Sequence, residues 1–243
     1  GYDKLTPDMA WSVTSSFYTD FSDISKWRKL QGSGAFTQKT GVTDALTGST
    51  VLEATGEVWA EYDQLIPYDP DVLYRITARV RQTVDPTSGG SNIYIGLVGY
   101  AADGVTRINK QGQNSVSNSH YIAASARTIT TADGWVTYTG YFKGLGTSPF
   151  DRANDPTNPT PLYNGIKYFK PMFILNHQGG NGTAQIDKFA VEIMEFPDAV
   201  INTARIKDAA VTTAKIADAS ITSAKIASAA IDTAHIKDGS ITN

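Results

Sequence analysis

About the last fifth of the chain repeats with a period of five residues, and this period limits how that part can fold. An Ile or Val stands at every fifth position from Ile201 to Ile241. Two places before each of them is Ala, or Gly239 in the last case. One aliphatic side chain in five residues makes a thin core. A single unit therefore cannot bury its apolar face and must stack on copies of itself.

The pentads alternate in character, so that two of them form one ten-residue unit. The residue before the aliphatic is Arg, Lys or His at positions 205, 215, 225 and 235, and is small or apolar in the pentads between. Residues such as Thr212 and Asp232 are good helix N-caps, and the runs that follow them are rich in helix formers. The other half is small and β-branched, which suits a short strand.

Two arrangements would bury the repeat. The chain could coil on itself, as in the pentapeptide-repeat proteins whose pattern it resembles, or identical chains could wind around a threefold axis. A four-sided coil gives no reason for a ten-residue alternation, whereas a trimer does if the two pentads face differently. We therefore predict a trimeric stem over residues 197–243, with a core formed by Ile206, Val211, Ile216, Ile221, Ile226, Ile231 and Ile236.

The segment TTAKIADASITSAKIASAAIDTAHIKDGSIT resembles the repeats of phage tail fibres and tail-tip host-specificity proteins. The resemblance covers only the repeat. It implies a structural component of a virion that acts outside the cell, is homotrimeric and contacts other tail proteins. It also implies host recognition, with a cell-surface polysaccharide or lipopolysaccharide as partner.

The composition excludes several classes of protein. The 243 residues carry a net charge of −3 and contain no Cys, which excludes disulfides, thiol catalysis and Cys-based zinc sites. No basic excess indicates nucleic acid binding, and no long apolar run indicates membrane insertion. Because the chain begins at Gly1, we expect a fragment or a processed product.

Residues 17–196 read as an all-β domain, preceded by a linker over residues 1–16. About ten short apolar segments are separated by Gly, Pro, Asn and Asp turns, which predicts a sandwich or barrel. In one of them Tyr74, Ile76, Ala78 and Val80 alternate with Arg75, Thr77, Arg79 and Arg81. This alternation predicts a half-buried strand with a cationic outer face.

The order of four weak motifs resembles carbohydrate-binding-module-like jelly rolls. They are an F-x-D-x-x-x-W start at Phe21, an L-x-P step at Leu65 that leads to Y-R-I at Tyr74, a D-G-W turn at Asp133 and an I-D-x-F-x-V strand at Ile186. The resemblance spans roughly residues 17–196. It implies a jelly-roll β-sandwich that binds glycan or acts as a spacer.

Surface aromatic residues are the first candidates for contacts with sugar, because a ring offers a rigid apolar face. Most aromatics in such a domain pack in the core or at sheet edges, and we assign Trp27 and Trp135 to the core. Together with two arginines, the aromatics that fall out of phase with the core or flank the long loop 144–165 form the predicted glycan-binding set: Trp59, Arg75, Arg79, Tyr94, Tyr100, Tyr163, Tyr168 and His177.

Asp187 is the polar residue that tells most about a possible cofactor. It is in step with Phe189, Val191 and Ile193, so it is predicted to point inward, and a buried carboxylate must be hydrogen-bonded, paired or metal-bound. In the modules that the chain resembles, this Asp often holds a structural Ca²⁺ with oxygens of the first strand, here Asp20 and Asp23. A hydrogen-bonding role without metal is the alternative.

Three functions remain open. The first is the phage tail component with a glycan-binding or spacer sandwich. The second is a carbohydrate-binding module of a secreted or surface glycan-active protein, with a monomeric pentapeptide-type coil. The third is a polysaccharide depolymerase. Because no catalytic motif is present and no carboxylate pair stands out, we expect that the chain is not an enzyme.

Overall fold

The computed structural model describes residues 12–195 apart from 88, 90 and 179. The chain divides into units of residues 1–197 and 198–243. Because the described residues end at Glu195, the predicted stem and its aliphatic core lie outside them. Most of the predicted N-terminal linker lies outside them as well. The first described strand begins at Ser12, earlier than the predicted domain start at Phe17.

The described residues form fourteen strands and one 3-10 turn. Their bounds are β1 Ser12–Thr19, β2 Trp27–Gln31, β3 Ala35–Lys39, β4 Val51–Thr55, β5 Val58–Tyr62, β6 Ile66–Pro67, β7 Leu73–Val84, β8 Asn92–Tyr100, β9 Arg107–Ile108, β10 His120–Thr128, η3 Thr131–Asp133, β11 Val136–Gly146, β12 Thr160–Tyr163, β13 Tyr168–His177 and β14 Thr183–Glu195. No helix within this part of the chain is long and apolar enough to cross a membrane.

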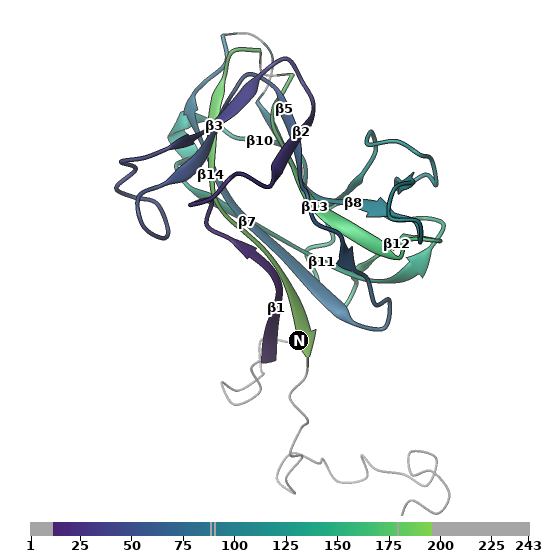
Figure 1. Ribbon diagram of the computed structural model, residues 1–243. Helices are drawn as coiled ribbons and strands as arrows, with labels where there is room; N and C mark the ends of the chain where they lie inside the picture. The colour runs from purple at the N-terminus through teal and green to yellow at the C-terminus, as the bar shows by residue number, and fades with distance from the viewer. Residues whose placement is uncertain (1–11, 88, 90, 179, 196–243) are drawn as a thin grey trace, which may run out of the picture. The chain divides into compact units, whose positions relative to one another are not determined.

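The strands form two sheets that face each other (Figure 1). The first sheet has the order β12-β11-β7-β14-β4-β3, with β1 also paired to β14. The second has the order β10-β8-β13-β5-β2, with β6 paired to β13 and β9 to β8. The predicted all-β sandwich is confirmed.

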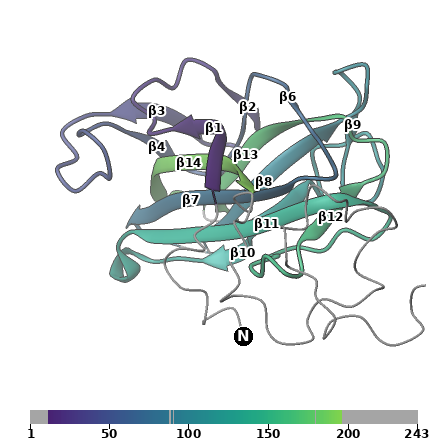
Figure 2. The same cartoon turned by 90° about the horizontal axis from the view of Figure 1, so that it is seen from below.

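Edge strand β10 of the second sheet runs beside β11 of the first (Figure 2). A Cβ atom at Gly140 in β11 would lie 2.4 Å from the carbonyl oxygen of Ile122 in β10. Only glycine permits this approach, which brings the two sheets together along one side.

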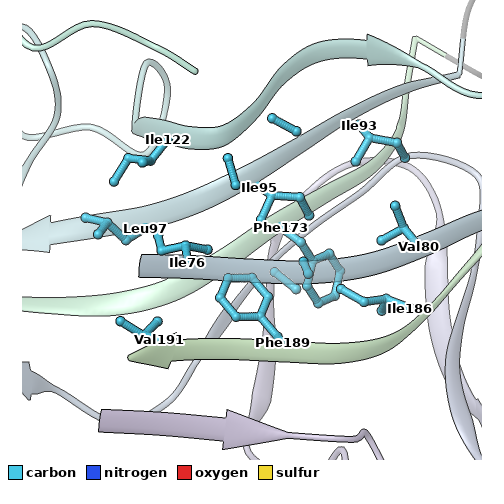
Figure 3. Close-up of a cluster of buried hydrophobic side chains, with 14 of the residues drawn as sticks. Ile76, Val80, Ile93, Ile95, Leu97, Ile122, Phe173, Ile186, Phe189 and Val191 are labelled. Carbon is cyan, nitrogen blue, oxygen red and sulfur yellow. The ribbon is translucent and has the colours of Figure 1, made fainter. Parts of the chain in front are cut away.

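The core fills the space between the sheets. Ile76 and Val80 of β7 and Phe189 of β14 face Ile95 of β8 and Phe173 of β13 (Figure 3). The predicted inward phase of β7 is confirmed, because Tyr74, Ile76, Ala78 and Val80 are all buried. Trp27 is also a core residue as predicted, with its ring centroid 4.8 Å from that of Phe173.

The assignment of Trp135 to the core is wrong, because this residue is only half-buried and lies outside the core. Two guanidinium groups contact its ring, with the Cζ atoms of Arg79 and Arg81 at 4.4 Å and 4.5 Å from the ring centroid. Val136, the next residue, pairs with Val80 of β7. Trp135 is therefore level with the outward-facing arginines, and stacking on them replaces burial in the core.

Candidate functional site

The face of the second sheet that points away from the core carries a row of rings. Four neighbouring strands contribute one each: Tyr121 from β10, Tyr94 from β8, His177 from β13 and Trp59 from β5. The ring centroids are separated by 4.8 Å between Tyr121 and Tyr94, 5.2 Å between Tyr94 and His177, and 5.8 Å between His177 and Trp59. We call these four residues the ring row.

Local alternation explains two of these positions. Val58 and Ala60 belong to the core, so Trp59 between them faces the other way. Ile93 and Ile95 do the same for Tyr94. Both orientations follow from the two-residue period of a strand, and both agree with the phases predicted from the sequence.

The ring row lines a cavity of about 310 Å³ together with Ile174. Polar side chains complete the lining: Lys110, Ser117, Asn118, Ser125 and Asp151. Aromatic surface combined with a few convergent polar groups is the usual composition of a small-molecule site. None of these five polar residues, nor Tyr121, was predicted from the sequence. The sequence did contain one signal that could have indicated Lys110, Ser117 and Asn118, which is the polar run between Thr106 and His120.

The loop after β9 is organised by Asn109, which is buried. Its Oδ1 accepts hydrogen bonds from the backbone N–H groups of Gln111 and Gln113, each at 2.9 Å, and its Nδ2 donates to Ser117 O at 2.8 Å. The backbone N–H of Lys110 donates to Asn118 O at 3.0 Å. These bonds hold Lys110, Ser117 and Asn118 beside the ring row.

Asp151 comes from the connection between β11 and β12 and joins the other polar groups. Its Oδ2 lies 2.7 Å from Lys110 Nζ and accepts a hydrogen bond from Ser125 Oγ at 3.0 Å. Lys110 Nζ is also 5.6 Å from the centroid of the Tyr121 ring. Burial raises the pKa of the Tyr121 hydroxyl to about 12, so this ring presents a neutral phenol at physiological pH.

Unusual backbone conformations border the cavity. Asn118, Ala126, Arg152, Asn176 and Gln178 all have positive φ, between 48° and 60°. Each either lines the cavity or follows or precedes a lining residue. Such conformations cost about 1–2 kcal/mol for residues other than glycine and asparagine, and they cluster at functional sites. We infer that the fold tolerates this strain in order to direct the cavity side chains.

His177 faces the cavity because β13 contains a bulge. Phe173 and Leu175 point into the core, so strict alternation would place His177 there as well. The pairing with β8 shifts its register between Ile174 and His177, and Asn176 turns inward in the left-handed conformation. The extra residue reverses the phase of the strand and places His177 in the ring row.

Asn176 fixes this bulge with hydrogen bonds that join the two sheets. It is fully buried, and its Nδ2 donates to Ala54 O at 3.1 Å and to Gly56 O at 3.0 Å. Its Oδ1 accepts from Gln82 Nε2 at 3.0 Å and from Ser91 Oγ at 3.2 Å. A buried amide with all these partners satisfied is a rigid anchor.

Glu57 holds the other end of the ring row. Its Oε1 accepts a hydrogen bond from Trp59 Nε1 at 2.7 Å, and its Oε2 accepts one from the backbone N–H of Gln178 at 2.9 Å. One carboxylate thus orients the indole ring and the residue that follows His177.

The remaining predicted aromatic residues lie outside the cavity. Tyr100 and Tyr168 are on the same face, but Tyr100 is buried and its hydroxyl donates to Glu61 Oε2 at 2.7 Å. Lys170 and Arg107 approach the same carboxylate, each at 3.7 Å. Tyr163, at the end of β12, packs against the core between the sheets.

Arg75 and Arg79 lie on the first sheet, so the structure separates them from the ring row. Arg75 pairs with Glu192 at 2.8 Å, and Arg79 pairs with Asp187. Arg81, beside them, pairs with Asp44 at 2.7 Å. The predicted cationic outer face of β7 exists, but side chains of β14 and of the loop before β4 neutralise it. The assignment of these arginines to one face with the aromatic residues is corrected, because β7 belongs to the other sheet.

Asp187 is buried as predicted, although it does not point into the core between the sheets. A bulge between Ile186 and Lys188 reverses the strand phase, so the carboxylate meets Arg79 and the backbone N–H of Leu46 at 2.8 Å. Burial raises its pKa, while the Leu46 N–H and Arg79 act in the opposite direction. These contacts support the hydrogen-bonding alternative for Asp187.

The other two predicted calcium ligands, Asp20 and Asp23, accept hydrogen bonds from backbone N–H groups of their own turns. Asp20 Oδ1 accepts from the backbone N–H of Ser22 at 3.0 Å and Asp23 Oδ1 from that of Ser25 at 2.8 Å. Within the described residues, no three His, Cys, Asp or Glu side chains gather in a way that could hold a metal ion. The structural calcium site stays a prediction.

His120 lies behind the cavity, at the start of β10. Its Nε2 accepts a hydrogen bond from the backbone N–H of Tyr163 at 3.2 Å, and burial lowers its pKa to about 3 from an ordinary 6.5. The folded protein therefore holds His120 neutral where the unfolded chain takes up a proton. We expect its contribution to stability to be full above pH 6.5. It should be lost as the pH falls toward 3, by up to about 1.4 kcal/mol per pH unit.

Urea unfolding of the wild type and His120→Gln between pH 4.5 and 8 measures this effect. Glutamine keeps an acceptor but does not titrate, so the stability advantage of the wild type should shrink as the pH falls. A stability difference between the two proteins that stays constant over this pH range would contradict the conclusion that folded His120 has a lowered pKa.

Comparisons with solved structures find domains of similar fold. No protein-family model and no curated protein matches the chain. Among solved structures, the CBM22-1 xylan-binding domain of Xyn10C from Paenibacillus barcinonensis has a TM-score of 0.45 at 11% identity, and the match covers 77% of this chain and 97% of that one. The family 11 carbohydrate-binding module of the Clostridium thermocellum cellulase Lic26A-Cel5E has a TM-score of 0.42 at 12% identity, with 76% and 96% covered.

A phage protein is also among the similar structures. The enzymatically active domain of tailspike protein 4 from bacteriophage CBA120 has a TM-score of 0.40 at 12% identity. The match covers 72% of this chain but only 20% of the tailspike chain.

Proposed function

We propose that the described domain is a glycan-binding module that holds a sugar chain against the ring row. The observation that carries this proposal is the alignment of Tyr121, Tyr94, His177 and Trp59 along one cavity. A sugar ring has apolar C–H faces and a rim of hydroxyl groups. The half-buried rings of Tyr94 and His177, which lie between the buried rings of Tyr121 and Trp59, suit the former. The hydroxyl, amide, ammonium and carboxylate groups of the cavity suit the latter.

Binding without cleavage fits the acidic groups of the cavity better than hydrolysis. Most glycoside hydrolases place two carboxyl groups on either side of the scissile bond. Among the described residues that line the cavity, Asp151 is the only acidic one, and it is paired with Lys110. We therefore do not assign a depolymerase activity to this site.

The proposal extends to a phage tail fibre or tail tip through the five-residue repeat. A trimeric stem over residues 197–243 would carry three copies of the module, so that weak binding to host polysaccharide or lipopolysaccharide at each site would gain from avidity. The second candidate is a carbohydrate-binding module of a secreted or surface glycan-active protein. One observation favours it: the described residues that line the cavity all lie between Trp59 and His177, so the site needs no residue of the repeat.

A glycan screen tests the binding function. The probes are immobilised xylan, β-glucan, mannan, galactan, polygalacturonate, alginate and bacterial lipopolysaccharide, with titration of any polymer that is retained. We expect saturable binding with a change in tryptophan fluorescence, because Trp59 lines the cavity. The absence of saturable binding to every probe would contradict the proposal.

The solution mass of the chain separates the two settings. We expect the full chain to be a trimer and a truncation after Glu195 to be a monomer, because the repeat would supply the contacts between chains. A monomeric full chain would contradict the fibre stem and favour the second candidate. Both species should show the same circular dichroism signal from the β domain.

A further inference from the structure

The Lys side chain that lines the cavity is paired with a carboxylate. Lys110 is the only Lys or Arg among the described residues that line the cavity, and Asp151 pairs with it at 2.7 Å. Arg152, next to Asp151, is exposed and does not line the cavity. An anionic ligand would therefore find no unmatched Lys or Arg among these lining residues.

A second carboxylate adds negative charge at the other end of the ring row. Glu57 accepts hydrogen bonds from Trp59 Nε1 and Gln178 N, and the described residues give it no ion pair. Asp151 and Glu57 both act on Tyr94 between them. Burial is the main cause of the raised pKa of the Tyr94 hydroxyl, and these two carboxylates raise it further.

Neighbouring charges do not offset this excess. Beyond Trp59, the cations Lys170 and Arg107 are engaged by Glu61, and Lys170 also pairs with Asp63 at 3.0 Å. The arginines of β7 lie on the other sheet and have their own carboxylate partners. Among the described charged groups that line the cavity or hydrogen-bond to a ring of the row, two are therefore negative, Asp151 and Glu57, against the single cation Lys110.

We infer that the cavity takes uncharged glycans and disfavours those that carry carboxylate, sulfate or phosphate groups, with Asp151 as the residue that determines this selectivity. The inference rests on the proposed glycan-binding function. Because the Asp151 side chain is only 23% exposed, a like charge placed beside it is screened less than on an open surface.

The test compares two derivatives of the neutral polysaccharide that the screen retains most tightly. The hydroxyethyl and carboxymethyl derivatives carry substituents of similar size and differ in charge. We expect the carboxymethyl form to bind the wild type at least roughly ten-fold more weakly, and the difference to shrink in about 0.5 M salt.

Asp151→Asn should reverse this preference, because it removes one carboxylate and leaves Lys110 unmatched. We expect the affinity for the carboxymethyl form, relative to that for the hydroxyethyl form, to rise about ten-fold. Asp155→Asn is the matched control, since Asp155 is exposed in the same connection and outside the cavity lining; it should behave as the wild type.

Lys110→Met provides a second variant, useful if Asp151→Asn does not fold as judged by thermal melting. It removes the matching cation, so the preference for the hydroxyethyl form should widen. Equal wild-type affinities for the two derivatives, or retention of acidic polymers only, would overturn the inference while leaving glycan binding in place. Failure of every probe to bind would instead contradict the proposed function.

Discussion

Replacement of Asn176 by alanine is expected to lower the free energy of unfolding by about 3–5 kcal/mol. Ala54 O and Gly56 O would lose the donor at Nδ2, and Gln82 Nε2 and Ser91 Oγ would each lose one of two acceptors. Alanine would also have to adopt the left-handed conformation of this residue, with φ of 55°, which costs about 1–2 kcal/mol more than for asparagine or glycine. The bulge that directs His177 outward would lose its anchor, so glycan affinity should fall as well.

Urea unfolding measures the loss of stability, and titration with the polysaccharide selected by the screen measures the loss of affinity. Asn154→Ala is the control, because Asn154 is exposed and its loss should change stability by less than about 0.5 kcal/mol. Asn176→Gly should recover only the part of the lost stability that comes from the left-handed backbone conformation. Glycine accepts positive φ but makes no side-chain hydrogen bond. A loss for Asn176→Ala no larger than that of the control would show that the buried network does not hold the bulge.

Tyr94→Ala is expected to weaken glycan binding by about thirty-fold, equivalent to about 2 kcal/mol. Tyr94 stands in the middle of the ring row, with its ring within 5.2 Å of both neighbouring ring centroids. Removing it would take away stacking surface and also let Tyr121 and His177 move. The side chain is only half-buried, so the cost in stability should be smaller than that of a core aromatic residue.

Isothermal titration with the polysaccharide selected by the screen measures this loss. Trp135→Ala is the matched control, because it removes a larger aromatic ring from the outer face of the first sheet. That variant should bind as the wild type does. If Tyr94→Ala kept full affinity while Trp135→Ala lost it, the binding surface would lie on the first sheet and the site would have to be reassigned.

Much of the candidate site follows from strand alternation. The phases of β5 and β8 turn Trp59 and Tyr94 away from the core, and both are read directly from apolar neighbours such as Val58 and Ile95. Alternation also places Tyr100 on that face, although the structure buries it against Glu61. A local period predicts which way a side chain points, but it does not predict how much of that side chain another segment covers.

The bulges were beyond local reasoning. Counting along β13 from Leu175 places His177 in the core, and counting along β14 from Phe189 places Asp187 there. In both strands one inserted residue reverses the phase, and the insertion becomes visible only in the pairing with another strand. The polar groups of the cavity were missed for a related reason, since Lys110 and Asp151 are 41 residues apart in the sequence.

The sequence by itself determined the class of the domain, the inward phase of its regular strands, and a stem period whose fold lies outside the described residues. These properties depend on residues close together in the chain, where side-chain period and turn chemistry act. Only the tertiary structure decided that β7 carries its arginines on the other sheet, that Asn176 turns His177 outward, and that two loops distant in the sequence bring Lys110 and Asp151 beside Tyr121. Such features depend on which strands become neighbours, and that choice is made by burial over the whole core.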